Sequence, residues 1–435
     1  MKIFVLSMGC AKNTADSEHL MALLKAAGHE IEDDATNADA AIINTCGFIL
    51  DAVKENIDAI LDLEDLKISG KIKKLIVLGC LVNRYEKDLQ KEFSSVDLFA
   101  RSEEWEKILE FLGGEVNSNC TIISPALDKR FWSRYLKVSE GCNTLCSYCA
   151  IPLIRGKLRS VPLKNLIDEA LMLCAAGAKE LCLVGQDLTV YGTDFDDENI
   201  NLKTLVHELD RELPKGTWIR LLYLHPNRVN EDLIDFLMSH EKVLHYLDIP
   251  IQHADPEILK AMNRPCPEWH LEKIFKYIRS LDNLFTLRTT IMTGFPGETQ
   301  ENFERVLDFL GEIEFDHLGV FSYSKEEGTA AAKLKKQVSK KIAEERCSEI
   351  LNLQSEIASE RSSLFDGREL EILVERFDKE NNELVAIGRS FRDAPEIDGL
   401  VFMKNLENKK IKSGDIVRAK IEDSLENDLF GKVVD

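Results

Sequence analysis

Apolar and polar positions alternate in a regular order along the first hundred residues. Short apolar runs of strand length are each followed by a stretch whose apolar residues recur at helical spacing. The predicted strand and helix pairs are Lys2–Ser7 with Ser17–Ala27, Ala40–Asn44 with Phe48–Leu61, and Lys74–Leu78 with Val82–Glu92. This order predicts a small α/β domain on a parallel sheet. We assign it to residues 1–117, with a polar end at Gly113–Asn119 and a linker near Ser124–Lys129.

The same alternation continues about six more times in the middle of the chain. Helical stretches such as Leu163–Ala176 and Thr299–Leu310 separate the apolar runs. Six β/α units indicate an incomplete form of the closed eight-unit barrel, with its site at the carboxyl ends of the strands. We assign this partial, TIM-like (β/α)6 barrel to residues 128–358. Its predicted strands are Tyr135–Ser139, Glu180–Gly185, Trp218–Leu224, Tyr246–Ile251, Leu287–Met292 and His317–Ser322.

A long polar helix at about Val338–Leu364 leads to a third zone, in which the period changes to that of short strands. Turn residues separate five apolar runs, which predicts a small five-stranded, OB-like β-barrel over residues 360–435. The fold class of the whole chain is therefore α/β with an all-β appendage. The predicted strands are Glu369–Arg376, Glu383–Ser390, Gly399–Met403, Asp415–Ile421 and Phe430–Val434.

Composition constrains the compartment and the use of the cysteines. No apolar run among the 435 residues approaches the roughly 20 needed to span a bilayer. The N-terminus lacks the apolar region and cleavage site of a signal peptide, so we expect a cytoplasmic protein. In a reducing compartment the 11 cysteines are poor candidates for disulfides and better candidates for metal ligands or small buried apolar residues.

The formal net charge of −21 favours basic partners and disfavours free nucleic acid. A local basic patch remains compatible with this total. A run of five lysines, which we call the lysine run, is the best candidate for an RNA patch, although a charge run before a surface helix is more often simply solvated. It comprises Lys333, Lys335, Lys336, Lys340 and Lys341.

Three cysteines at CxxxCxxC spacing, namely Cys142, Cys146 and Cys149, follow the first strand of the predicted barrel. A structural zinc site is closed by four ligands, and an ordinary cubane cluster takes four cysteines. Three thiolates leave one iron of a 4Fe-4S cluster open, and the amino and carboxylate groups of S-adenosylmethionine can chelate that iron. Zinc with a remote fourth ligand is the main alternative.

Three further cysteines, Cys10, Cys46 and Cys80, each follow the carboxyl end of a predicted strand of the first domain. Ligands of open α/β sheets gather outside those ends. A single cysteine at such a place is more often a small buried residue. The repetition at three strand ends favours a second cluster with its own open iron.

With these residues in view, the chain resembles the radical S-adenosylmethionine methylthiotransferases along nearly its whole length. The last zone is similar to the TRAM domain of that family, and two of its stretches, Gly388–Ser390 and Asp393–Gly399, resemble the branch that acts on a ribosomal protein. The other resembling stretches are Ser7–Asn13, Asp16–Glu18, Ile43–Ile49, Ser139–Cys142, Tyr246–Ala254, Gly294–Thr299 and Glu326–Ala331.

The resemblance implies two 4Fe-4S clusters and two molecules of S-adenosylmethionine. One molecule donates a methyl group to sulfur, and the other gives a 5′-deoxyadenosyl radical. The radical takes a hydrogen from the β-carbon of an aspartate in the basic ribosomal protein S12 of the small subunit, and that carbon receives the methylthio group. A reducing electron donor is a further implied partner, and neither a membrane nor nucleic acid is an expected main partner.

Six other residues are candidates for the S-adenosylmethionine pocket, each with a structural alternative. Tyr148 lies near the adenine or packs on the barrel. Arg288 and Thr290 share one face of a strand, where a cofactor carboxylate is one possible partner for the guanidinium. Gly294 allows close backbone approach or simply a turn before a helix. Gln186 and Asp187 follow the second barrel strand at the expected mouth of the barrel, or cap a loop. No catalytic side chain beyond the cluster ligands is predicted, and His225 and His253 are expected to be structural.

The close rival is the tRNA-modifying branch of the same family, which shares both cysteine sets. From Gly367 onward the chain has 12 lysines and arginines against 16 aspartates and glutamates. An RNA-binding barrel should be basic, whereas an acidic one suits a basic ribosomal protein. From another class, a non-catalytic iron–sulfur carrier or a zinc-bound interaction module would fit the cysteines alone.

Overall fold

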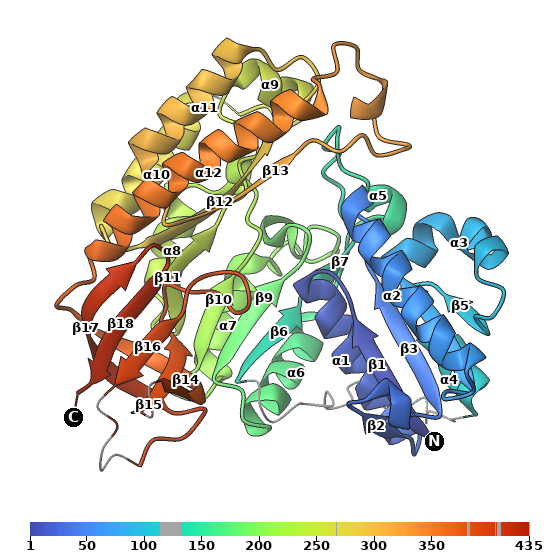
Figure 1. Ribbon diagram of the computed structural model, residues 1–435. Helices are drawn as coiled ribbons and strands as arrows, with labels where there is room; N and C mark the ends of the chain where they lie inside the picture. Colours follow the sequence, from blue (N-terminus) through green and yellow to red (C-terminus); the bar gives the residue numbers. More distant parts are fainter. Residues whose placement is uncertain (114–131, 267, 381–382, 405, 407–409, 435) are drawn as a thin grey trace.

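The computed structural model describes residues 1–113, 132–266, 268–380, 383–404, 406 and 410–434. In these ranges the chain forms an N-terminal parallel sheet, a central open β/α sheet and a C-terminal closed barrel, as the alternation of apolar runs predicts (Figure 1). The predicted linker at Ser124–Lys129 and residues 114–119 lie outside the described residues.

The N-terminal sheet has five parallel strands in the order β2-β1-β3-β4-β5. Its two central strands are buried on both faces because helices cover each side. Ile43 and Val77 pack into one apolar cluster and Ile42 and Ile76 into the other. The strands are β1 Lys2–Ser7, β2 Glu30–Glu32, β3 Ala40–Thr45, β4 Lys74–Gly79 and β5 Leu98–Ala100, and the helices are α1 Ala11–Ala26, α2 Leu50–Ile68, α3 Cys80–Glu92 and α4 Trp105–Leu112.

The central sheet has six parallel strands in the order β13-β12-β11-β10-β9-β6. Strands β6 and β13 are its two edges, so the barrel is open, as expected for six β/α units. Its strands are β6 Ser133–Lys137, β9 Glu180–Val184, β10 Trp218–Leu221, β11 Val243–Asp248, β12 Thr286–Thr293 and β13 His317–Ser322.

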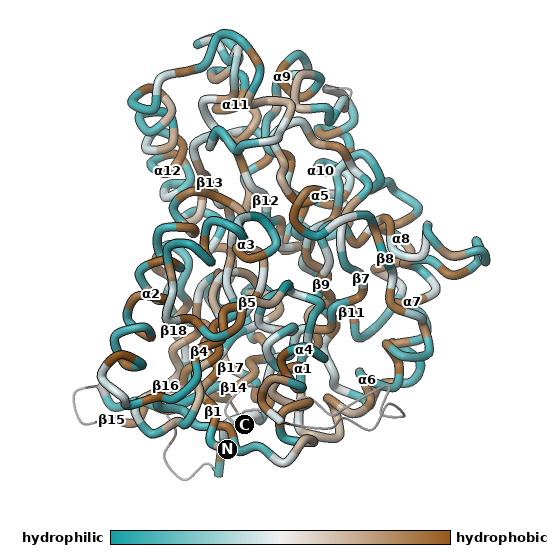
Figure 2. Tube along the Cα trace, turned by 90° about the vertical axis from the view of Figure 1, so that its right-hand side faces the viewer, coloured by the Kyte–Doolittle hydropathy of each residue, from teal (hydrophilic) through white to brown (hydrophobic). Residues whose placement is uncertain are grey.

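Helices cover the outer face of the central sheet, and one long apolar core fills the space between the two layers. In Figure 2 the strands of the interior carry much of the apolar colour and the outer loops are largely hydrophilic. The helices are α5 Ile151–Ile154, α6 Leu163–Ala175, α7 Leu202–Glu212, α8 Glu231–Met238, α9 Pro256–Ala261, α10 Glu268–Leu281, α11 Gln300–Ile313 and α12 Lys340–Ser363, and two short strands, β7 Ser139–Glu140 and β8 Arg159–Ser160, pair near the site.

Helix α12 leads into a closed five-stranded barrel with the order β14-β15-β16-β18-β17. Its interior holds apolar side chains from every strand, among them Ile372, Ala386, Val401, Ala419 and Leu429. The strands are β14 Glu369–Glu380, β15 Glu383–Arg389, β16 Val401–Lys404, β17 Ile416–Leu425 and β18 Asp428–Val433.

The loop of residues 390–398 between β15 and β16 closes the lower end of the open central barrel. Ala394 is fully buried among central-sheet residues such as Val184 and Leu222. The Tyr246 hydroxyl donates to Asp398 (2.7 Å), and the guanidinium of Arg220 donates to the carbonyl of Phe391 (2.8 Å). The loop therefore occupies this end, and the cavity that collects the predicted cysteines lies at the other end, where the strands finish.

Within the described residues, no helix has both the length and the apolar composition needed to cross a membrane.

Candidate functional site

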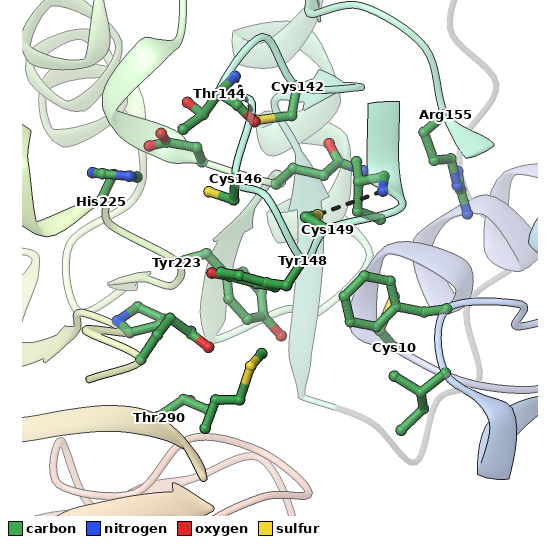
Figure 3. A pocket seen from close by; sticks show the side chains of 18 of the residues that line it. Cys10, Cys142, Thr144, Cys146, Tyr148, Cys149, Arg155, Tyr223, His225 and Thr290 are labelled. Carbon is green, nitrogen blue, oxygen red and sulfur yellow. Dashed lines mark hydrogen bonds between the residues drawn. The ribbon is translucent and has the colours of Figure 1, made fainter. Parts of the chain in front are cut away.

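One cavity of about 370 Å³ collects the two predicted cysteine sets. It lies between the N-terminal domain and the carboxyl ends of the central strands. In Figure 3 the side chains of Cys142, Cys146 and Cys149 approach it together, and those of Cys10 and Arg155 enter from the right-hand side. We call Cys10, Cys46 and Cys80 the first trio and Cys142, Cys146 and Cys149 the second trio; all six line the cavity.

The first trio meets because of the order of the strands. Cys46 and Cys80 directly follow β3 and β4, and Cys10 lies three residues beyond the end of β1. These strands are neighbours in the sheet, and chain order reverses between β1 and β3. Gly9 allows the close approach of two of these loops. Its φ is +96°, and a Cβ there would lie 2.7 Å from the Cβ of Cys46.

The second trio lies on the loop that follows β7. Each of its sulfurs accepts one hydrogen bond: Cys142 from the N–H of Thr144 (3.3 Å), Cys149 from the N–H of Ile151 (3.4 Å), and Cys146 from the guanidinium of Arg264 (3.5 Å). Donors directed at sulfur favour the thiolate form, which is the form that binds metal.

Arg155 connects the two trios. It follows Cys149 by six residues at the end of α5, yet its Nε donates to Cys80 Sγ at 3.0 Å. The same guanidinium pairs with Asp16 (2.9 Å) and Glu140 (2.7 Å), and it is almost completely buried. Sequence reasoning missed this residue, because its role depends on the docking of two segments far apart in the chain.

Burial has a large effect on the ionisation of the cysteines. It raises the pKa of Cys46 and Cys142, raises that of Cys80 to about 11 and raises that of Cys149 to about 12. Burial acts in the same direction on Cys10, but there the Lys12 ammonium and nearby backbone N–H groups prevail and lower the pKa. Metal binding at these thiols must therefore displace protons, and it should weaken at low pH.

The two cysteine trios do not form a site for a single metal ion within the described residues. Over the ranges that the structure describes, no three His, Cys, Asp or Glu side chains are placed to hold one metal ion, although each trio faces the same cavity. A cubane is wider than one ion and takes cysteine thiolates at its corners. The described cysteines also form no disulfide, which leaves their thiols available.

Four of the six candidates for the S-adenosylmethionine pocket line the cavity: Tyr148, Gln186, Asp187 and Thr290. Burial raises the pKa of Tyr148 far above its ordinary value. The Gln186 amide donates to Glu140 (3.0 Å), and Asp187 pairs with Arg228 (2.7 Å).

The other two candidates, Arg288 and Gly294, are not among the residues that line the cavity. Arg288 lies lower in the barrel and contacts the carboxylates of Asp248 and Asp398, each at 3.3 Å, so protein side chains neutralise its charge. Gly294 faces helix α12, because a Cβ there would lie 2.4 Å from the Cβ of Ala343.

The cavity also contains polar residues that the sequence pattern did not single out. Lys12 Nζ lies 3.8 Å from the centre of the Tyr223 ring. His225, expected to be structural, accepts a hydrogen bond from the N–H of Asn227 and also lines the cavity, where burial lowers its pKa to about 2. Proximity in sequence to Cys10, a cysteine of the first trio, is the one signal that could have identified Lys12. The remaining polar lining includes Gln252, Arg264, Ser324 and Glu326.

The contacts of His253 and of the lysine run are those of structural or solvent-exposed residues. His253 is buried and accepts a hydrogen bond from the N–H of Asp255 (2.9 Å). The lysines of the run are exposed, and two of them, Lys340 and Lys341, lie near glutamates one turn further along α12.

An open six-stranded β/α sheet with a CxxxCxxC loop at its mouth defines a radical S-adenosylmethionine protein. The Radical SAM superfamily model matches residues 136–310, the model for the Uncharacterized protein family UPF0004 matches residues 2–100, and the TRAM domain model matches residues 367–434. Among solved structures, the radical S-adenosylmethionine methyltransferase TsrM from Kitasatospora setae has the same central fold, with a TM-score of 0.54 at 14% identity over 74% of each chain.

The similarity to curated proteins covers the whole chain. The ribosomal protein uS12 methylthiotransferase RimO of Lachnoclostridium phytofermentans is 40% identical over 99% of both chains. The RimO of Aquifex aeolicus is 41% identical over 99% of this chain and 97% of its own. The chain therefore belongs to the RimO family of radical S-adenosylmethionine methylthiotransferases.

Proposed function

We propose that this protein inserts a methylthio group at the β-carbon of an aspartate in ribosomal protein uS12, the substrate that the names of its relatives give. The observation that carries the proposal is the cavity lined by two cysteine trios. Each trio is one ligand short of the four that close a cubane, so each leaves a metal position free. One open metal position suits radical generation, and a second suits the handling of sulfur.

The second trio would hold one 4Fe-4S cluster and the first trio would hold another. When bound, these clusters supply an electron, an open iron that S-adenosylmethionine chelates, and a second open iron for sulfur. The chain's own residues position them. Arg264 and the backbone N–H groups of Thr144 and Ile151 direct hydrogen bonds at the sulfurs of the second trio, and Arg155 does so at Cys80.

The walls of the cavity bind S-adenosylmethionine and exclude water. Tyr148, Gln186, Asp187 and Thr290 share the cavity with the second trio and offer an aromatic face and polar groups. Much of the remaining lining is apolar, which keeps bulk water away from a reactive carbon radical. The apolar lining includes Phe48, Ile49, Ile151, Met292 and Phe321.

In the overall reaction, one hydrogen of the substrate β-carbon is replaced by a methylthio group, whose sulfur would be supplied as sulfide held at the first trio. One S-adenosylmethionine loses its methyl group and leaves as S-adenosylhomocysteine. The other takes up an electron and the substrate hydrogen and leaves as methionine and 5′-deoxyadenosine. A reducing electron donor is therefore a required partner, and a ribosomal substrate places the reaction in the cytoplasm.

The acidic C-terminal barrel supports a basic protein substrate over tRNA. It carries 12 basic and 16 acidic residues from Gly367 onward, and such a surface attracts uS12 and repels phosphate. We further propose that the chain divides at residues 1–117, 128–358 and 360–435, with the last unit contributing to substrate binding. A non-catalytic iron–sulfur carrier would need neither the S-adenosylmethionine cavity nor this appendage.

The test is anaerobic reconstitution followed by incubation with dithionite, S-adenosylmethionine and uS12, and then peptide mass spectrometry. We expect one methylthio group on a uS12 aspartate and two clusters per chain. Replacing either trio with alanines should remove about half of the iron and sulfide. The matched control is Cys266→Ala, because Cys266 is buried in the barrel core and does not line the cavity.

Two results would contradict the proposal. Zinc without sulfide in the purified protein would exclude both clusters. A methylthio group on tRNA adenosine, with uS12 left unmodified, would assign the protein to the RNA-modifying branch.

A further inference from the structure

Three cationic side chains line the cavity within the described residues: Lys12, Arg155 and Arg264. Arg155 is neutralised by Asp16 and Glu140, at 2.9 and 2.7 Å. Arg264 donates to the sulfur of Cys146 and to the carbonyl of Pro250. Lys12 differs from both, because over the part of the chain that the structure describes its ammonium group has neither a carboxylate partner nor a carbonyl or sulfur acceptor, and it contacts the Tyr223 ring instead.

The surroundings of Lys12 hold it in place. It lies in the first turn of α1, and its Nζ lies 3.8 Å from the centre of the Tyr223 ring. Tyr223 belongs to the central domain and donates its backbone N–H to Asp248 (3.2 Å). The ring supports the ammonium by a cation–π contact. The face of the Tyr223 ring accepts no conventional hydrogen bond. The N–H groups of the Lys12 ammonium are therefore still able to donate to a ligand in the cavity.

Lys12 also lies on the side of the cavity formed by the first trio. It follows Cys10 by two residues, and its positive charge acts on the Cys10 thiol. The arginine without a carboxylate partner, Arg264, lies instead beside Cys146 of the second trio. The cavity therefore presents one available cation near each trio.

The radical step of the proposed reaction brings two carboxylates into this cavity. One belongs to S-adenosylmethionine, which reacts at the second trio, on the side of Arg264. The other belongs to the substrate aspartate, whose β-carbon is bonded directly to the carboxylate carbon. Because the methylthio group is delivered from the side of the first trio, the substrate carboxylate must also lie near that trio.

We propose that Lys12 binds the side-chain carboxylate of the substrate aspartate and so selects aspartate and positions its β-carbon. This inference rests on the proposed function. A half-buried cation in a cavity gains more from an ionic partner than an exposed cation does, because water screens the pair less. Adenosine in tRNA offers no carboxylate to this ammonium, so Lys12 also determines the class of substrate.

A double-mutant cycle tests the interaction. Wild-type enzyme and Lys12→Met are each assayed with uS12 and with uS12 in which the target aspartate is replaced by asparagine. Lys12→Met should lower kcat/KM for the aspartate substrate by about tenfold to a hundredfold, the range of a charge-assisted hydrogen bond. It should lower kcat/KM for the asparagine substrate by less than about threefold.

Two further variants distinguish the loss of carboxylate binding from a general loss of folding or of iron content. Lys12→Arg keeps the charge and should retain the preference for aspartate over asparagine, even if Lys12→Met binds less iron. The matched control is Lys25→Met, an exposed lysine on the same helix and outside the cavity, which should behave as wild type. Iron content and 5′-deoxyadenosine formed without substrate should be unchanged in Lys25→Met, and in the two Lys12 variants the rates are compared per bound cluster.

Equal losses on both substrates in Lys12→Met would overturn the inference, because Lys12 would then serve the first trio or the fold. A wild-type enzyme that modifies aspartate and asparagine equally well would overturn it as well. If wild-type enzyme modifies no uS12 at all while tRNA acquires the methylthio group, the proposed function fails, and the inference fails with it.

Discussion

The guanidinium of Arg155 is the point where the two halves of the site meet. It contacts Cys80 of the first trio and two buried carboxylates, Asp16 and Glu140, one from each side of the domain boundary. A planar group with five donors can satisfy all of these partners at once, which lysine cannot do. Arg155 therefore both neutralises buried charge and fixes the position of the Cys80 thiol.

Arg155→Met should lower the free energy of unfolding by about 3–5 kcal/mol, because two buried carboxylates lose their partner. It should also reduce the iron bound at the first trio, since Cys80 loses its donor. The matched control is Arg134→Met, which breaks the buried Arg134–Glu18 pair (2.8 Å) across the same boundary. Anaerobic urea unfolding and iron analysis measure both effects. Equal loss of iron in the two variants would assign Arg155 a purely structural role.

The variant Gly9→Ala tests whether the loops that carry Cys10 and Cys46 must approach each other closely for the first trio to bind iron. In Gly9→Ala the new methyl group would lie 2.7 Å from the Cβ of Cys46, so Cys46 must move and iron binding at the first trio should fall at least tenfold. Gly28→Ala is the matched control, because Gly28 also has a positive φ (+83°) but has no atom within 4 Å of the new Cβ. It should cost only about 1 kcal/mol of stability and leave iron binding unchanged.

At the scale of elements, the apolar runs predicted the long strands to within a few residues, and β1 and β13 without error. Strands β2 and β5 were missed because three residues carry too little pattern. Helix α1 begins at Ala11, six residues before the predicted start. Its first turns contain Lys12, Asn13 and Asp16, which face the polar boundary with the central domain and interrupt the apolar pattern.

The same reasoning explains which parts of the site could be predicted. The cysteines were found because the carboxyl ends of parallel strands meet at one edge, a property that a sequence pattern displays. Arg155 and Lys12 were not found, because their partners come from another domain and no local pattern encodes the docking. Arg288 was placed in the expected site from its position on an inward-facing strand, but that position did not reveal how deep in the barrel it lies.

A contact between His19 of α1 and Glu169 of α6 joins these two helices at the domain boundary. His19 Nε2 lies 2.7 Å from Glu169 Oε1. Burial opposes protonation of His19, but the Glu169 carboxylate prevails and raises the pKa above 6.5. The stabilisation is therefore complete below the unfolded-state pKa and is lost as pH rises through the raised folded-state pKa.

We expect the stability of the wild-type protein to fall by up to about 1 kcal/mol between pH 6 and pH 9 through this pair. His19→Gln should lack that part of the pH dependence, whereas replacement of the exposed His245 by Gln should keep it. Thermal unfolding at a series of pH values measures the difference. Parallel curves for wild type and His19→Gln would contradict the assignment.

At the scale of the whole molecule, the C-terminal barrel is attached to the central domain by buried charges. Glu180 of β9 is fully buried and accepts hydrogen bonds from Arg220 (2.6 Å) in the central domain and from Arg389 (2.7 Å) at the end of β15. Beside this triad the 390–398 loop enters the lower end of the open barrel. Glu180 therefore contributes, together with the Tyr246–Asp398 hydrogen bond, to the position of the acidic appendage relative to the cavity.

Glu180→Gln keeps the shape of the side chain but leaves the buried guanidinium of Arg220 without a counter-charge and that of Arg389 with Glu375 as its remaining carboxylate partner. We expect a loss of about 3–5 kcal/mol in the free energy of unfolding and faster hydrogen exchange in the 390–398 loop. Glu375→Gln is the matched control, because Glu375 pairs with the same Arg389 at 2.7 Å but is 25% exposed, and its loss should cost under about 1 kcal/mol.

Acid titration is a second test of the contact between Glu180 and the two arginines, Arg220 and Arg389. Burial opposes ionisation of Glu180, yet the two arginines prevail and lower its pKa from 4.5 to about 2. A depressed folded-state pKa contributes stability that is present above the unfolded-state pKa and is lost as pH falls toward the folded-state pKa.

In wild type, hydrogen exchange in the 390–398 loop should therefore accelerate between about pH 4.5 and pH 2 relative to Glu180→Gln. The variant should already exchange fast at neutral pH and show no such step. A step of equal size in both proteins would mean that other carboxylates hold the appendage in place.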